Sequence, residues 1–118
     1  MTKDQTTKRF DLEERALIFA KDVREFIRTL PKTIQNNEDS RQLIRSSGSV
    51  GANYIEGNES LGKKDFVMRL RIARKEAKES AFWLALVDAG NEHRERDRLR
   101  SEARELMLIL TSIIKKVS

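Results

Sequence analysis

The strongest chemical feature of this 118-residue sequence is a concentration of positive charge in residues 62–78. The segment, GKKDFVMRLRIARKEAK, contains seven Lys and Arg and two Asp and Glu, and this excess of +5 (7 − 2) equals the net charge of the whole chain. On a helix, its exposed cations fall within about 60° of one another, with one more on the flank. We call this set the basic stripe: Lys64, Arg71, Arg74, Lys75 and Lys78.

A stripe of this kind can contact successive phosphates of a nucleic acid. No aromatic residue interleaves it except Phe82 at its end, so base stacking is not predicted. The alternative is a solvent-exposed helix face whose cations pair with Glu side chains on neighbouring helices. The sequence alone leaves both interpretations open.

Residues for catalysis or metal binding are sparse. The absence of Cys excludes a thiol nucleophile, a Cys-ligated zinc and a disulfide framework. The single His, His93, lies in the charged segment NEHRER and is predicted to be a surface residue. Glu76 and Glu79 could form an acid–base pair, but a spacing of one turn with no predicted cleft favours a structural role. We therefore expect a non-enzymatic protein without metal or cofactor.

The segment GNESLGKK, residues 57–64, approaches the phosphate-binding loop G-x-x-x-x-G-K-[ST]. It departs from the motif at Lys64, where Ser or Thr should bind Mg²⁺, and it follows a predicted helix instead of a strand. We interpret it as a helix-to-helix loop.

Apolar residues recur at intervals of three and four along almost the whole chain, which indicates amphipathic helices. Asp11 is a good N-cap for the first helix, and Pro31 ends it. The polar stretch 35–40 is predicted to connect it to a second helix that begins at Asp39 or Ser40. The approximate helix bounds are 11–31, 39–57, 63–88 and 94–117.

Short links between four such helices predict an all-α, antiparallel up-down-up-down four-helix bundle. Residues 1–9 are expected to form a flexible arm, and residues 10–118 a single domain. Phe66 and Ala81 are predicted core residues of the third helix, and Ile113 and Val117 of the fourth. The sequence has no signal peptide and no apolar run long enough to cross a membrane, so we expect a cytoplasmic protein.

Small polar residues share one side of the second predicted helix: Gln42, Ser46, Ser49, Asn53 and Glu56. Hydroxyl, amide and carboxylate groups at this spacing suit close helix contact with side-chain hydrogen bonds. Long charged side chains would be more common on a solvated face. This pattern therefore favours a subunit interface over simple exposure to solvent.

Three segments resemble a known family: FDLEERALIFAKDVREFIRTLP, QLIRSSGSVGANYIEGNES and KDFVMRLRIARKEAKESAFWLAL. The most specific element is the S-x-x-x-N-x-x-E-G arrangement of Ser49, Asn53, Glu56 and Gly57, followed by Lys-Asp-Phe and a helix with Trp83. The chain resembles the proteins encoded in intervening sequences of bacterial 23S ribosomal RNA genes, often called four-helix bundle proteins. The resemblance covers nearly the whole chain after the first nine residues. The fourth helix is matched by its hydrophobic pattern alone.

This resemblance implies an antiparallel four-helix bundle that assembles as a ring-like homopentamer and has no catalytic residues. The role of the family is generally unassigned. One branch, the accessory protein of diversity-generating retroelements, binds a reverse transcriptase and nucleic acid through a basic surface. The resemblance also implies roles in structure or assembly for Ser49, Asn53 and Glu56, and we place Gly57 and Trp83 with them.

We therefore expect an oligomeric bundle that binds RNA or DNA through the basic stripe. The alternative is an interaction scaffold that docks a partner protein, such as a reverse transcriptase, without direct contact to nucleic acid.

Overall fold

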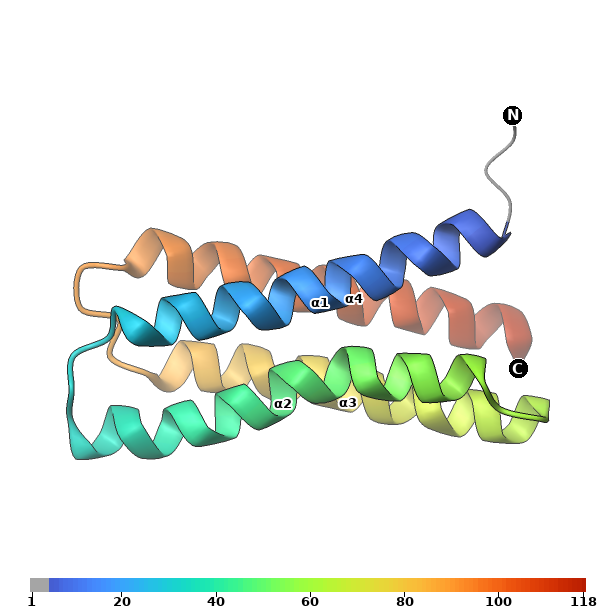
Figure 1. Ribbon diagram of the computed structural model, residues 1–118, viewed down its shortest axis with the longest axis horizontal. Helices are drawn as coiled ribbons and strands as arrows, with labels where there is room; N and C mark the ends of the chain where they lie inside the picture. Colours follow the sequence, from blue (N-terminus) through green and yellow to red (C-terminus); the bar gives the residue numbers. More distant parts are fainter. Residues whose placement is uncertain (1–4) are drawn as a thin grey trace.

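The computed structural model describes the backbone of residues 5–118 and the side chains from Leu12 onward, and this part of the chain forms four α-helices (Figure 1). Their bounds are α1 Gln5–Arg28, α2 Ile34–Asn58, α3 Lys63–Leu86 and α4 His93–Val117. The chain reverses direction at each connection, and the described residues contain no strand. The predicted all-α, antiparallel up-down-up-down four-helix bundle is therefore confirmed.

The first helix begins earlier than predicted. α1 starts at Gln5, so Asp11 lies within the helix and is not its N-cap. Residues 5–11 contain no Gly or Pro, the two residue types that most disfavour a helix, so the helix can continue toward the N-terminus. Residues 5–9 of the expected arm are thus helical, whereas residues 1–4 lie outside the described part of the chain.

The second helix also begins earlier than predicted, at Ile34 instead of Asp39 or Ser40. Thr33 is its N-cap: the backbone there is extended, and the Thr33 side-chain oxygen accepts a hydrogen bond from the Asn36 backbone N–H at 3.0 Å. The polar residues 35–40 were expected to form a connection. They form the first turns of α2, where Asn36 and Ser40 are buried and most of the other polar residues are exposed.

One apolar core runs along the bundle, and α1 buries the face that its spacing predicts. In α3 the buried face differs from the predicted one near both ends of the helix, because Val67 and Ser80 are buried while Phe66 and Ala81 are only partly covered. In α4, Ile114 is buried at the last turns, and Ile113 and Val117 pack at the margin of the core. None of the described helices has a stretch long and apolar enough to cross a lipid bilayer.

The seam between α2 and α3 is closely packed. A buried hydrogen bond of 2.9 Å joins the hydroxyls of Ser46 and Ser80 across it. At the other end of the seam, Gly57 is buried against α3. A Cβ atom at Gly57 would lie 2.8 Å from Leu70 Cδ1 and 3.3 Å from Arg69 Cβ. Gly57 therefore permits an approach of the two helices that a larger residue would prevent.

Gly57→Ala should lower the free energy of unfolding by about 1 kcal/mol. Overpacking costs about 1–3 kcal/mol, which exceeds the gain of about 1 kcal/mol from better helix propensity. Gly48→Ala is the matched control in the same helix, since a Cβ there meets only Arg24 Nη2, at 3.7 Å. Urea denaturation followed by circular dichroism should show Gly48→Ala to be stabilising. A stabilised Gly57→Ala protein would contradict the steric explanation.

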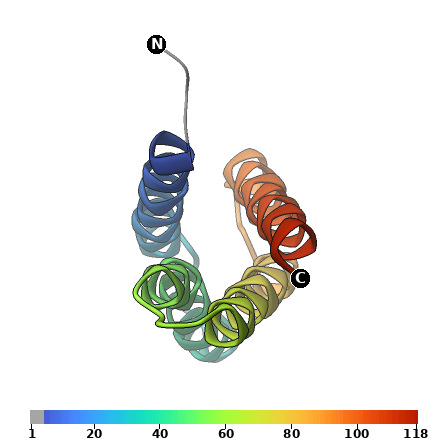
Figure 2. The same ribbon diagram turned by 90° about the vertical axis from the view of Figure 1, so that its right-hand side faces the viewer.

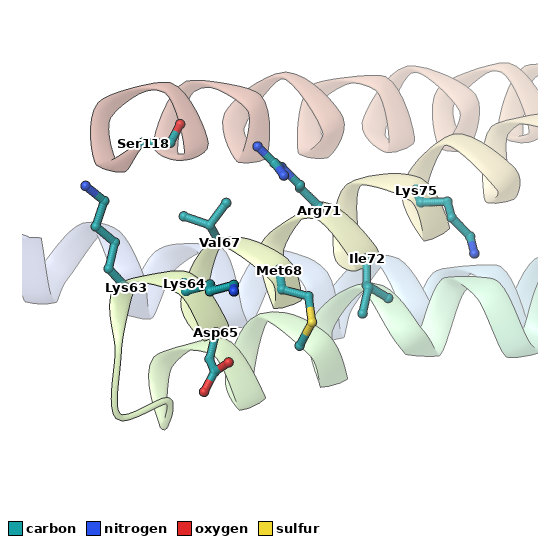
Figure 3. Close-up of a pocket in the computed structure, with 9 residues that line it drawn as sticks. All are labelled: Lys63, Lys64, Asp65, Val67, Met68, Arg71, Ile72, Lys75 and Ser118. Carbon is teal, nitrogen blue, oxygen red and sulfur yellow. The ribbon is translucent and has the colours of Figure 1, made fainter.

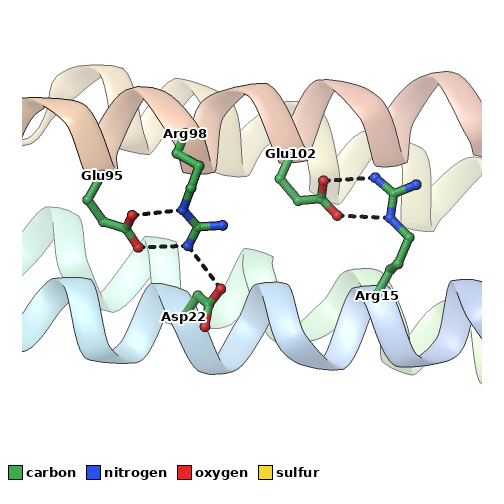
Figure 4. A network of polar contacts seen from close by, with 5 residues as sticks. All are labelled: Arg15, Asp22, Glu95, Arg98 and Glu102. Carbon is green, nitrogen blue, oxygen red and sulfur yellow. Dashed lines mark hydrogen bonds and ion pairs between the residues drawn. The ribbon is translucent and has the colours of Figure 1, made fainter.

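Viewed toward the end where α4 terminates, the helices form an open U in which α1 and α4 are the two arms (Figure 2). α1 and α4 have the sparsest contacts of the four adjacent pairs. Arg15 joins them through two hydrogen bonds to Glu102, at 2.8 and 3.1 Å (Figure 4). Arg98 binds Glu95 in its own helix, and its Nη2 donates to Asp22 Oδ2 of α1 at 2.9 Å. The hydrogen bonds that Arg98 donates to Glu95 lower the pKa of the Glu95 carboxyl.

Asn36 connects two loops at the end of the bundle where the α1–α2 and α3–α4 connections lie, and its side chain is buried. Its Nδ2 donates to the Pro31 carbonyl at 3.0 Å and to the Asp88 carbonyl at 2.9 Å. Its Oδ1 accepts from the Asp88 backbone N–H at 2.9 Å. Gly90, with a φ of 57°, lies close to the Pro31 ring, where a Cβ would be 3.2 Å from Cδ. A single side chain thus ties the α1–α2 connection to the α3–α4 connection.

Candidate nucleic-acid interface

The basic stripe occupies the face of α3 that points away from the core. Lys64, Arg71, Lys75 and Lys78 are exposed. Arg74 is half-buried at the edge nearest α4, where its Nη1 donates a hydrogen bond of 3.5 Å to Thr111 Oγ1. The structure therefore brings the five predicted residues together on one surface, with Arg74 partly engaged by its own chain.

The exposed cations of the stripe have no ion-pair partner within residues 12–118. The ion pairs of the described side chains involve arginines of α1, α2 and α4, such as Arg15 and Arg98, and none involves a stripe residue. The interpretation of this face as a set of pairs with neighbouring Glu side chains is thus not supported. Exposed cations that form no direct ion pair remain available to an anionic ligand.

The amino-terminal half of the stripe borders a groove of about 790 Å³, which we call the α3 groove (Figure 3). Its apolar residues are Val67, Met68 and Ile72, and Ser118 borders it from the end of α4. Its charged residues are Lys63, Lys64, Asp65, Arg71 and Lys75. Figure 3 shows Lys63 and Arg71 extending toward α4, whereas Met68 and Ile72 extend away from it.

Residue spacing alone did not predict the α3 groove, although the sequence contains part of its pattern. Met68 and Ile72 follow Lys64 by four and eight residues, so they form an apolar row beside the stripe. Lys63 belongs to the same basic segment but lies about 100° from Lys64 around the helix. The contribution of Ser118 depends on how α4 packs against α3, which residue spacing does not reveal.

The residues Ser49, Asn53, Glu56 and Gly57 were predicted to serve a subunit interface or a structural motif. Asn53 has partners within the chain: its Oδ1 accepts from Arg69 Nη1 at 3.1 Å, and its Nδ2 donates to the Ser49 carbonyl at 2.9 Å. Gly57 lies against α3, whereas Glu56 is exposed. Asn53 and Gly57 thus act in the α2–α3 seam of one protomer, and a role in assembly remains a prediction.

Trp83, from the same predicted set, is half-buried and packs against the core. It contacts Phe82 edge to face, with ring centroids 5.1 Å apart. Phe82 is 58% exposed at the carboxyl-terminal end of the stripe. The aromatic pair therefore anchors one ring in the bundle and leaves the other on the surface.

Glu76 and Glu79 lie one turn apart on α3, beside the stripe. Burial raises the pKa of Glu76, and the neighbouring Glu79 carboxylate raises it further, while Lys75 and Arg45 oppose the rise. His93 is exposed, as predicted, with its Nδ1 at 3.2 Å from Arg96 Nη2. Within the described residues, no group of three or more His, Asp or Glu side chains is placed to hold a metal ion.

Comparison with known proteins agrees with the sequence resemblance. The family model described as 23S rRNA-intervening sequence protein matches residues 8–112. The chain belongs to this family. The match covers most of α4, which the resemblance had reached only through its hydrophobic pattern.

Among solved structures, this chain is similar to a crystal structure from Bacteroides thetaiotaomicron, described as a protein of unknown function from the S23 ribosomal protein family. The two share 28% sequence identity over 88% of this chain and 98% of that chain, with a TM-score of 0.77. No curated protein matches the chain. The comparisons thus establish the family and the fold. The molecular role must be inferred from the surface of α3.

Proposed function

We propose that this bundle is a non-enzymatic, oligomeric cytoplasmic protein that binds nucleic acid through the basic stripe of α3. The observation that carries the proposal is the set of exposed cations on one helix face, without ion-pair partners among the described side chains. From Lys64 to Lys78 the stripe is about 21 Å long, which is enough to reach several phosphates along one strand.

The stripe offers charge but few groups that could distinguish bases. Lys and Arg contacts to phosphate position a protein on a nucleic acid without reading its sequence. Binding should therefore tolerate different sequences and depend strongly on salt.

Assembly would multiply this surface. Several large apolar side chains are exposed on the isolated chain: Leu17, Ile18, Ile55, Phe82, Leu86 and Leu108. Exposed apolar groups of this size are common at protein interfaces. We infer that copies associate, with the homopentamer implied by the resemblance as the expected form. Each added copy would bring another basic stripe to the same polyanion.

The wild-type protein should bind a fluorescein-labelled RNA hairpin and a DNA duplex with a Kd of about micromolar at low salt. Four phosphate contacts imply about a hundredfold loss of affinity between about 50 and 200 mM salt. Fluorescence anisotropy titrations at the two concentrations measure this loss, and the slope gives the number of contacts. Absence of binding to both probes at the lower salt would overturn the proposal.

A further inference from the structure

The α3 groove differs from the rest of the basic stripe, because its cations are accompanied by accessible apolar side chains. Met68 is 49% exposed, and Ile72 beside it is partly exposed. Four cations and one carboxylate line the groove, a local net charge of +3 (4 − 1). An occupant that satisfies both features must combine negative charge with an apolar face.

A nucleic acid satisfies only the first feature. Its phosphates suit the cations, but its base edges carry donors and acceptors that need hydrogen-bond partners or an aromatic surface on which to stack. Val67, Met68 and Ile72 provide neither, and no aromatic residue lines the groove. Contact with bases would therefore leave polar atoms desolvated on an aliphatic surface.

An amphipathic helix with acidic residues beside its apolar stripe satisfies both features. Helices of this type dock by laying the apolar face into a groove, while charges at the rim select the partner. Lys63 and Lys75, at the two ends of the charged lining, are about 18 Å apart along α3, which corresponds to about three turns of a docked helix. The length, charge and apolar character of the groove thus describe one class of ligand.

We propose that the α3 groove binds an acidic amphipathic helix of a partner protein. Apolar side chains of that helix cover Met68 and Ile72, and its carboxylates pair with the Lys and Arg residues of the rim. Lys64, Arg71 and Lys75 belong to both the groove and the basic stripe. The helix therefore competes with nucleic acid for these cations, a consequence that rests on the proposed function.

The test uses a fluorescein-labelled synthetic helix of about 14 residues, with Leu at intervals of three and four and Glu between them. A peptide of the same composition in scrambled order keeps the charge but has no continuous apolar face. Anisotropy should show at least about tenfold tighter binding of the amphipathic peptide by the full-length protein. Equal affinities for the two peptides would overturn the proposal.

Met68→Ser with Ile72→Ser should abolish this tenfold preference and leave the affinity for the labelled RNA hairpin unchanged. Ile34→Ser is the matched control, because Ile34 is 80% exposed at the start of α2, outside the groove, and its change should leave the preference intact. Circular dichroism establishes that each variant is folded. A preference retained in the double variant overturns the proposal.

The RNA titrations distinguish failure of this inference from failure of the proposed function. Loss of RNA affinity in the double variant, with peptide binding unaffected, would assign the groove to nucleic acid and overturn the inference. Absence of RNA binding by the wild-type protein would refute the proposed function alone. The peptide preference and its loss in the double variant would still support the groove as a helix site.

Discussion

Lys75→Glu combined with Lys78→Glu should reduce the affinity for the RNA hairpin at low salt by at least about a hundredfold. Each substitution removes one phosphate contact and places a carboxylate next to the phosphate that remains. The dependence of log affinity on log salt should become shallower by about two units, one for each lost contact. Both quantities come from anisotropy titrations at several salt concentrations.

The control for this variant separates a local contact from the effect of total charge. Lys21→Glu with Lys32→Glu changes the net charge of the chain by the same amount at exposed positions outside α3. It should weaken binding only slightly and keep the salt dependence of the wild-type protein. Equal losses in the two double variants would show that overall charge, and not the basic stripe, governs binding.

Asn36→Ala should lower the free energy of unfolding by about 2–4 kcal/mol. The change removes three hydrogen bonds and leaves the Asp88 N–H and the carbonyls of Pro31 and Asp88 without these partners. Each intramolecular hydrogen bond typically contributes about 0.5–1.5 kcal/mol to stability, so the loss of all three accounts for this range. Since Ala is itself a good helix former, the loss cannot come from reduced helix propensity.

The neighbouring residue supplies the control. Asn37 lies in the same turn of α2 but is exposed, so Asn37→Ala should change stability by less than about 0.5 kcal/mol. Urea denaturation of both variants, followed at a helical wavelength, measures the difference. Similar stabilities of the two variants would rule out the proposed role of Asn36 as a bridge between the loops.

The helices and the fold class could be predicted because the apolar spacing of each helix is a local property of the sequence. The start of α2 could not, because its polar first turns resemble a loop until Asn36 meets a backbone partner 52 positions away. The same limit applies to the small polar residues of α2. Ser46 suggested an interface between subunits, and it is hydrogen-bonded to Ser80 in the same chain, 34 positions away.

The same distinction between local spacing and contacts with distant residues applies to the candidate site. Helical spacing placed the cations of the basic stripe on one face of α3. Spacing could not show that these cations are without ion pairs among the described side chains, because that depends on which carboxylates the other helices present. It also could not show the α3 groove, which Ser118 at the end of α4 lines together with residues of α3.

The ion pairs between α1 and α4 affect how the molecule approaches a ligand. On that side, Arg15 and Arg98 are neutralised by Glu102, Glu95 and Asp22, whereas the α3 side carries cations without such partners in the described chain. The basic stripe therefore forms a region of positive potential on α3. A polyanion would be attracted to this region before contact, which raises the rate of association more than it slows dissociation. Association would then be fast, and added salt would slow it by screening the electrostatic attraction.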